Sequence, residues 1–486
     1  MLGRACLPAG AAEGGGAPPP NILFLAVDDL RPSIGAYGDR LAVTPHLDRL
    51  AASGTLFERA YCQQAVCSPS RTSLLTGVRP DTTGIYDLAT HFRSRLPELV
   101  TLPEHFRKHG YRVIGRGKIY HSLALDDPAS WDSPPAEGRS LAGTVYALPE
   151  NRAEPPADGA GGEKARVRRP AFERAEVPDT AYGDGILAEE AAGLLGELKR
   201  EGKPFFLAIG FLKPHLPFNA PSSYWELHDR EKLWPPPNLR IPEGVPAWVS
   251  QPGWELRNAY AVPSDYAVPL DLELQKTLRH GYYAATSYVD AQIGKVLAAL
   301  DREGLAQNTI VVLWGDHGYL AGDHGTWCKH TNFELAVHAP LLLRVPGQRP
   351  GLRVGATVEF LDIYPTLAAL AGLPIPAHVE GRSLAPYLAD PSRPADKPAF
   401  SQYPRGAVKT GNPMMGYSVR TARWRYTEWI RTDTGAAAFR ELYDLDADPH
   451  CTRSVAEDPA HGETVAELSR LLEGAGKGVA EARRQR

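Results

Sequence analysis

Two stretches of this chain are so continuously apolar that we expect both to be strands buried on both faces of a sheet. Residues 21–27 have the sequence NILFLAV and residues 309–314 have the sequence TIVVLW. Uninterrupted runs of this kind are typical of parallel sheets that are covered on both sides. Ionisable residues follow each run, Asp28-Asp29 after the first and Asp316-His317 after the second. Because α/β sheets bind ligands beyond the carboxyl ends of their strands, these residues predict a site at one edge of the sheet.

Strand and helix patterns alternate along the first three quarters of the chain. Further strands are predicted at 111–115, 204–211 and 339–345, and the longest predicted helices cover 184–200 and 274–303. This alternation predicts the α/β class, with a large and mostly parallel sheet sandwiched between helices.

After about residue 376 the pattern changes to shorter segments of alternating polarity. Residues 417–426 are an example, and a helix is predicted at 463–472. We therefore expect a smaller C-terminal α+β subdomain built on an antiparallel sheet. A chain of 486 residues is also longer than single hydrophobic cores usually grow. The predicted division is a catalytic domain at 21–375 and the subdomain at 376–486.

The first 20 residues are predicted to be a disordered start or a truncated leader. They contain a Gly/Ala/Pro-rich run but lack the apolar core of ~7–15 residues that a secretory signal needs. As it stands the sequence predicts a cytoplasmic protein, and a periplasmic or secreted one if the leader is truncated. Nothing in the pattern indicates the oligomeric state.

Composition argues against several classes of function. The formal net charge is −4 and charged residues make up 23% of the chain, so there is no basic stripe for nucleic acid. No stretch has the ~20 apolar residues that cross a bilayer. The cysteines are odd in number and scattered, which predicts neither a disulfide framework nor a zinc site. They are Cys6, Cys62, Cys67, Cys328 and Cys451.

The segment that begins at Cys67 has the composition of a reactive turn. Its sequence is CSPSRTSLLTG, and Pro69 suits the first turn of a helix, where its missing N–H costs nothing. Cys67 would then lie at a helix N-terminus, where backbone N–H groups favour negative charge. Arg71 adds a guanidinium fork suited to tetrahedral oxyanions. The segment predicts a nucleophile beside an oxyanion pocket, although a buried structural cysteine in a tight turn also fits these residues.

A metal site and a group of cations are predicted around this segment. The three carboxylates of Asp28, Asp29 and Asp316 favour a hard divalent cation, and Ca²⁺ fits an oxygen-rich set better than zinc does. The cations lie in segments after predicted strands, where a dianionic ester needs positive partners. They are Lys118, His121, His215 in Lys213-Pro214-His215, and Lys329. Lys118 and His121 would share a face if their segment turns helically.

The same residues carry a resemblance to a known family. Cys67-x-Pro-Ser-Arg followed by Leu-Thr-Gly is the signature of the type I sulfatases, which belong to the alkaline phosphatase superfamily. The chain resembles this family from Asn21 to about Val455. The resemblance implies that a modification enzyme converts Cys67 to formylglycine, whose hydrated aldehyde is the nucleophile. It also implies one Ca²⁺ ion held by Asp28, Asp29, Asp316, His317 and the modified Cys67.

The resemblance implies a role for each remaining residue. Arg71, Lys118 and Lys329 would neutralise the sulfate together with the metal. Asp316 would act as the base, and His215, or Lys329 in its place, would protonate the leaving oxygen. His121 would deprotonate the remaining hydroxyl and so release sulfate. The expected substrate-binding residues are Lys118, His215, Lys329 and Tyr319.

Within the family the chain is most similar to the iduronate-2-sulfatase type. The similarity rests on residues 213–218, 315–318, 327–329, 401–405 and 415–421, and on His317, where many sulfatases carry asparagine. Tyr319 departs from the tryptophan expected there. The implied substrate is a sulfated carbohydrate, a 2-O-sulfated uronic acid of a glycosaminoglycan. Two alternatives stay open: a phosphonate or phosphate monoester hydrolase of the same superfamily, and a non-catalytic glycan-binding relative.

Overall fold

The computed structural model describes residues 18–139, 145–152, 168–406 and 413–473. Residues 1–17 of the predicted leader at 1–20 lie outside the described part of the chain.

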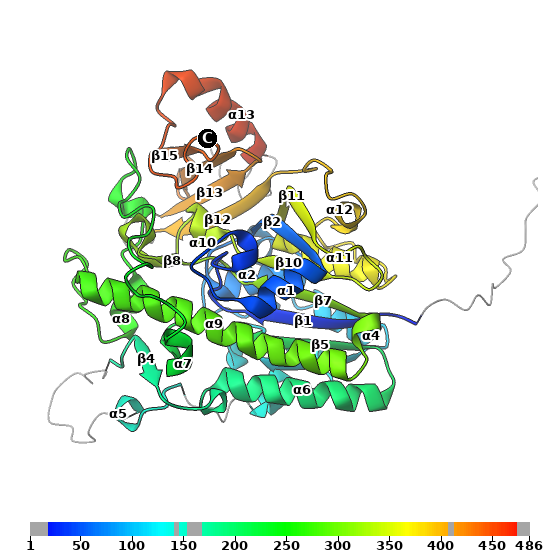
Figure 1. Ribbon diagram of the computed structural model, residues 1–486. Helices are drawn as coiled ribbons and strands as arrows, with labels where there is room; N and C mark the ends of the chain where they lie inside the picture. Colours follow the sequence, from blue (N-terminus) through cyan, green and yellow to red (C-terminus); the bar gives the residue numbers. More distant parts are fainter. Residues whose placement is uncertain (1–17, 140–144, 153–167, 407–412, 474–486) are drawn as a thin grey trace, which may run out of the picture.

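The molecule is built on a seven-stranded sheet in which β1 lies inside, between β7 and β5 (Figure 1). Six strands share one direction and β10 runs against its neighbours β7 and β2. The predicted mostly parallel sheet is therefore confirmed. In order the strands are β11 (Leu352–Glu359), β2 (Thr55–Tyr61), β10 (Leu341–Arg344), β7 (Thr309–Gly315), β1 (Asn21–Val27), β5 (Phe205–Phe211) and β3 (Arg112–Gly117).

The sheet is buried on both faces because alternate residues of each strand enter different cores. In β1, Ile22 and Phe24 face one core while Leu23 and Leu25 face the other, as the period of two along a strand requires. The second core is covered by α1 (Pro45–Ser53), α6 (Gly183–Glu201) and α9 (Leu272–Arg302), the last two side by side in Figure 1. The first is covered by α2 (Cys67–Thr76), α4 (Leu102–Lys108) and α11 (Ile363–Leu370).

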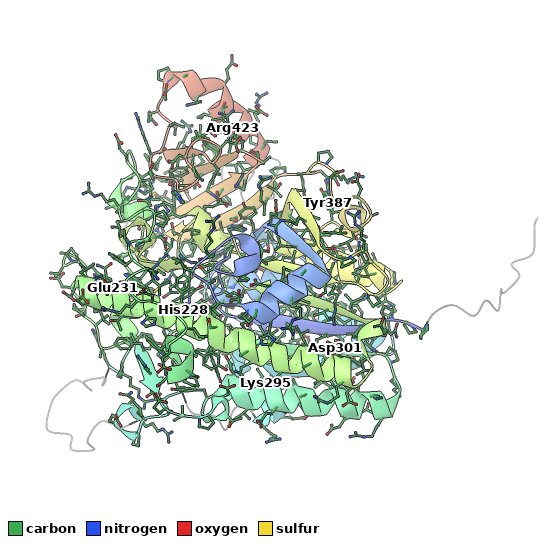
Figure 2. All side chains as sticks on the ribbon, viewed as in Figure 1. His228, Glu231, Lys295, Asp301, Tyr387 and Arg423 are labelled. Carbon is green, nitrogen blue, oxygen red and sulfur yellow. The ribbon has the colours of Figure 1, made fainter. Side chains whose placement is uncertain are left out.

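The C-terminal subdomain is the predicted antiparallel sheet. Its four strands follow one another in order, and α13 (Gly462–Glu473) packs on them through Leu468 and Leu472. Figure 2 shows the side chains on the ribbon and labels Arg423 on this subdomain and Lys295 and Asp301 on α9. The strands are β12 (Ala399–Arg405), β13 (Met414–Arg420), β14 (Trp424–Arg431) and β15 (Ala437–Asp444).

The subdomain contacts the large sheet near the Cys67 segment. The backbone N–H of Gln402 donates to the carbonyl of Gln63 at 2.7 Å, and the hydroxyl of Ser401 donates to the carbonyl of Cys62 at 2.6 Å. These bonds hold the connection between β2 and α2.

Short elements occupy the segments between the main strands and helices. Several of them pack close to the site. In the part of the chain described here, no helix is both long and apolar enough to cross a bilayer. These elements are α3 (Pro80–Thr83), α5 (Pro149–Arg152), β4 (Phe172–Ala175), β6 (Phe218–Pro221), α7 (Ser222–Trp225), α8 (Trp254–Ala259), β8 (Leu320–Ala321), β9 (Trp327–Cys328), α10 (Glu334–Val337) and α12 (Ala385–Ala389).

Candidate active site

The carboxyl ends of β1 and β7 bring the two predicted acidic pairs together. The strands are paired in parallel with Val27 opposite Gly315. The Oδ1 atom of Asp316 accepts hydrogen bonds from the backbone N–H groups of Asp29 and His317, each at 3.0 Å. Beyond the last backbone pairing of β1 and β7, the side chain of Asp316 therefore joins the segments that follow the two strands.

Four potential metal-binding side chains converge at this point. Donor atoms of Asp28, Asp29, Cys67 and His317 all lie within 4.8 Å of one another. The sulfur of Cys67 is 3.4 Å from Oδ1 of Asp28 and 3.4 Å from Nε2 of His317. The Nδ1 atom of His317 faces the carbonyl of Gly318 at 2.9 Å, which leaves Nε2 to act as the ligand.

Cys67 is the first residue of α2, so its predicted place at a helix N-terminus is confirmed. Its side chain is buried, with 2% exposed. Burial raises the pKa of the Cys67 thiol well above its ordinary value, and the charge of Asp28 raises it further against the opposing Lys118 and Lys329. The thiol is therefore protonated at neutral pH and is not a nucleophilic thiolate.

Arg71 lies beneath the carboxylates and is fully buried. Its Nε donates to Oδ2 of Asp316 at 2.8 Å and its NH2 nitrogen donates to Oδ1 of Asp28 at 3.2 Å. The NH1 nitrogen donates to the carbonyls of Lys118 and Ile119. Arg71 thus fixes two carboxylates and the segment that carries Lys118. Asp316, which the sequence predicts to be a metal ligand, lies outside the four-residue donor group and is bonded to this guanidinium.

Two ammonium groups neutralise the paired carboxylates. The Nζ atom of Lys118 pairs with Asp28 and lies 3.8 Å from the sulfur of Cys67. The Nζ atom of Lys329 lies 2.9 and 3.0 Å from the two carboxylate oxygens of Asp29. Burial would raise the pKa of Asp28, but Lys118, His215 and Arg71 outweigh it and hold that pKa well below its usual range.

His215 lies in the same cluster with both ring nitrogens against acceptors. Nδ1 is 2.6 Å from the carbonyl of Leu216, and Nε2 is 3.0 Å from Oε1 of Glu255 and 3.9 Å from Oδ2 of Asp29. Burial lowers the pKa of His215, and the two carboxylates more than offset this, so the pKa lies above its ordinary value.

Glu255 is the residue of the site that the sequence analysis missed. Its Oε2 atom lies 2.7 Å from Nζ of Lys329, and its carboxylate thereby joins Lys329 to His215. It is carried by α8, inside a proline-rich section without helical or strand periodicity. The only signal for Glu255 in the sequence was indirect: Lys329 and His215 were predicted to lie close together, and buried cations require a counter-ion.

His121 and Lys118 come together differently from the sequence prediction. Residues 118–121 form bends after β3 and not a helical turn, since the backbone N–H of Lys118 donates to the carbonyl of Gly210. Burial and the charge of Lys118 lower the pKa of His121 to about 4. Its Nδ1 atom is buried and has no hydrogen-bond partner among the described residues.

Tyr319, expected from the sequence to bind substrate, is instead fully buried in the core of the protein. Its ring stacks on that of Tyr282 from α9 with centroids 5.1 Å apart, and its hydroxyl donates to the sulfur of Cys328 at 3.7 Å. The side chain is part of a core cluster that also contains Phe218.

A cavity of about 350 Å³ opens beside Lys118 and His121. Lys213 also lines it, and its Nζ donates to the carbonyls of His215 and Pro217 at 2.9 and 2.5 Å. This amine therefore holds the loop that carries His215. Lys118 connects this cavity to the donor group, because it lines the cavity while its Nζ atom lies 3.8 Å from the sulfur of Cys67.

Comparison with known proteins decides the family. The sulfatase family model matches residues 20–373, and a model of the N-sulphoglucosamine sulphohydrolase C-terminal region matches residues 322–477. The chain belongs to the sulfatase family. It is accordingly a sulfuric ester hydrolase of the alkaline-phosphatase-like fold, and both predictions are confirmed.

Individual relatives match this chain over almost its whole length. Iduronate 2-sulfatase of Mus musculus is 35% identical over 535 residues, which cover 95% of this chain and 96% of the relative. The Homo sapiens protein is 34% identical, with 91% and 92% covered. A solved phosphonate monoester hydrolase from Silicibacter pomeroyi is 26% identical, with a TM-score of 0.72 and 94% and 95% covered. A structure described as a 2-O GAG sulfatase has a TM-score of 0.70 at 24% identity, with 96% and 92% covered.

Proposed function

We propose that this sulfatase removes sulfate from a 2-O-sulfated uronic acid of a glycosaminoglycan. The similarity to iduronate 2-sulfatase over more than nine tenths of both chains supports the substrate class. The observation that carries the chemistry is the pair of ammonium groups, Lys118 and Lys329, each of which is bound to a carboxylate of the donor group around Cys67.

The buried donor group fits a divalent cation. Asp28, Asp29 and His317 would hold Ca²⁺ together with Cys67, and Asp316 is next to them, with its Oδ2 atom 3.6 Å from Nε2 of His317. Carboxylate oxygens prefer hard cations, and a neutral buried thiol is a poor ligand for one. An oxygen in place of the sulfur suits the site better, as it would be after conversion of Cys67 to formylglycine. When bound, the cation would supply charge neutralisation for the sulfate oxygens, and Cys67 converted to formylglycine would supply an oxygen nucleophile.

Two histidines near the donor group have protonation states that suit their predicted roles. Asp316, held by Arg71, would accept the proton of the attacking hydroxyl. His215 would donate a proton from Nε2 to the leaving oxygen, consistent with its raised pKa. His121 is neutral above a pKa of about 4 and has a free Nδ1 atom, so it can accept the proton whose removal releases sulfate.

The substrate assignment can be tested with defined disaccharides. Release of sulfate should occur from non-reducing 2-O-sulfated uronic acid termini of heparan and dermatan fragments. Activity confined to 6-O-sulfated hexosamine would overturn the assignment while leaving the sulfatase chemistry intact.

A second candidate function is hydrolysis of phosphonate or phosphate monoesters, which the Silicibacter pomeroyi relative supports. Paired assays with 4-nitrophenyl sulfate and 4-nitrophenyl phenylphosphonate separate the two. We expect higher kcat/KM for the sulfate ester, and a strong preference for the phosphonate would favour the second function.

The non-catalytic alternative requires an unmodified Cys67. Peptide mass analysis of the segment should show a loss of about 18 Da relative to cysteine when sulfur is exchanged for the aldehyde oxygen. An intact thiol in a host that performs the modification would favour a binding protein.

A further inference from the structure

A second cavity, of about 470 Å³, is lined neither by the donor group nor by any residue of the cavity beside Lys118. Its walls come from the loop that follows β1, from α9, and from residues 233–238, 323–324, 334–338 and 449–451. The proposed reaction uses none of its side chains. Its volume is within the range that small-molecule sites have.

The charged groups of this cavity leave one guanidinium uncompensated. Arg31 and Arg279 line it and are 5% and 4% exposed. They share a single carboxylate oxygen, Oδ2 of Asp323, which lies 2.6 Å from Arg31 and 3.6 Å from Arg279. Two buried cations on one carboxylate favour the entry of a further anion.

The other acidic groups of the lining are already engaged. Glu334 pairs with Arg425 at 2.5 Å and with Arg420 at 3.3 Å. Asp39 accepts hydrogen bonds from the hydroxyl of Tyr283 at 2.7 Å and from the backbone N–H of Leu41 at 2.9 Å. Neither carboxylate pairs with Arg279.

Arg279 also carries a polar atom without a partner. Its NH1 nitrogen donates to the carbonyl of Ala321 at 2.9 Å, but its Nε is buried and bonds to none of the described residues. A buried charged N–H group without an acceptor is costly, which is why such groups are rare unless a ligand or water completes them. Three histidines, His324, His338 and His450, also line the cavity. Much of the remaining wall is apolar and is formed by Tyr37, Leu41, Leu233, Pro235, Pro237, Tyr283 and Leu335.

We propose that this cavity is a binding site for a small organic anion, whose carboxylate or tetrahedral oxyanion group pairs with Arg279 and Arg31 while its body packs on the apolar walls. A guanidinium binds either anion through paired N–H donors. The site is joined to the candidate active site, since the N–H of Arg31 donates to the hydroxyl of Tyr282, which donates to the carbonyl of Asp29. The proposal does not depend on the proposed substrate.

The position of the ligand can be tested in crystals of the full chain soaked separately with 4-bromobenzoate and with selenate. We expect an anomalous bromine peak inside the cavity, with the carboxylate directed at Arg279. A selenium peak there without a bromine peak would assign the site to inorganic oxyanions. Selenium at the candidate active site is distinguished by its position. Absence of both peaks from the cavity would overturn the proposal.

Binding in solution can be tested by titrating 4-bromobenzoate calorimetrically into the wild type and Arg279→Gln. We expect at least tenfold weaker binding to the variant and no change for Arg353→Gln, a control whose side chain is 53% exposed. If Arg279→Gln does not fold, His450→Glu places a repelling carboxylate on the exposed side of the same cavity, and it should weaken binding severalfold. If Arg279→Gln or His450→Glu folds and binds 4-bromobenzoate with the same affinity as the wild type, the proposal is contradicted.

Discussion

The carboxylate of Glu255 lies 2.7 Å from the ammonium nitrogen of Lys329, and its other oxygen lies 3.0 Å from Nε2 of His215. One acidic side chain on a short helix therefore orients two of the cations that surround the donor group. Neither cation reaches the site from the same element as Glu255, because Lys329 follows β9 and His215 follows β5.

The first prediction concerns this carboxylate. In Glu255→Gln, Lys329 and His215 lose a charged partner, so we expect both to be less well positioned and kcat/KM to fall at least tenfold, which corresponds to ~1.4 kcal/mol of transition-state stabilisation. Steady-state hydrolysis of an aryl sulfate measures the effect. Glu231→Gln is the matched control, since that glutamate pairs with Lys276 at the surface and is labelled in Figure 2. Equal kinetics for both variants and the wild type would show that Glu255 has no role in positioning.

The second prediction concerns Cys67. In a host that does not convert serine, Cys67→Ser should fold, because the hydroxyl is smaller than the thiol and keeps contact with Asp28, but turnover should be abolished. Circular dichroism and thermal unfolding report the fold, and sulfate release reports the activity. Turnover close to that of the wild type would rule out the precursor role of the cysteine.

Several features of the site could be predicted because local sequence determines them. The apolar run of β1 ends at Val27, and the acidic pair must then emerge at the carboxyl edge of the sheet. The same holds for Asp316-His317 after β7. The start of α2 at Cys67 could also be predicted locally, because Pro69 suits the first turn of a helix.

The features that could not be predicted depend on contacts between distant segments. Glu255 lies on α8, which begins after Gly253, a residue at φ +77° that packs so closely on Trp327 that a Cβ atom there would be 3.0 Å from that side chain. Tyr319 follows the Gly-Asp-His-Gly segment in sequence, yet its ring is drawn into the core by Tyr282. Neither neighbour is recognisable from periodicity.

The third prediction concerns the metal. Chelation with EDTA should lower activity, and added Ca²⁺ should restore it better than Mg²⁺, because a site of several protein oxygens suits the larger ion. Elemental analysis should find about one calcium per chain in the wild type. Asp28→Asn should reduce that content, whereas Asp433→Asn, at an exposed ion pair with Arg431, should not. Full calcium content in Asp28→Asn would place the ion elsewhere.

The last prediction concerns the pH dependence of stability at Asp323. Burial would raise the pKa of this carboxyl, but Arg31 and Arg279 lower it from 3.8 to about 2. A lowered pKa means that the folded state binds the proton less tightly than the unfolded state does. The carboxylate therefore contributes about 2 kcal/mol of stability above pH 4, and this contribution is lost as the pH falls through about 2.

Asp323→Asn removes that contribution and leaves two buried guanidinium groups without a counter-ion, so we expect a clear fall in the unfolding temperature at pH 7. The gap between wild type and variant should narrow as the pH falls below about 4, because Asp323 of the unfolded wild type then binds a proton while Asp323 of the folded state, with a pKa of about 2, stays ionised. Thermal unfolding from pH 7 to pH 3 measures both effects. Asp433→Asn should unfold within about a degree of the wild type at each pH, since exposed ion pairs contribute little. A gap that is constant with pH would show that the ion pair with Arg31 and Arg279 does not set the acid stability of this part of the fold.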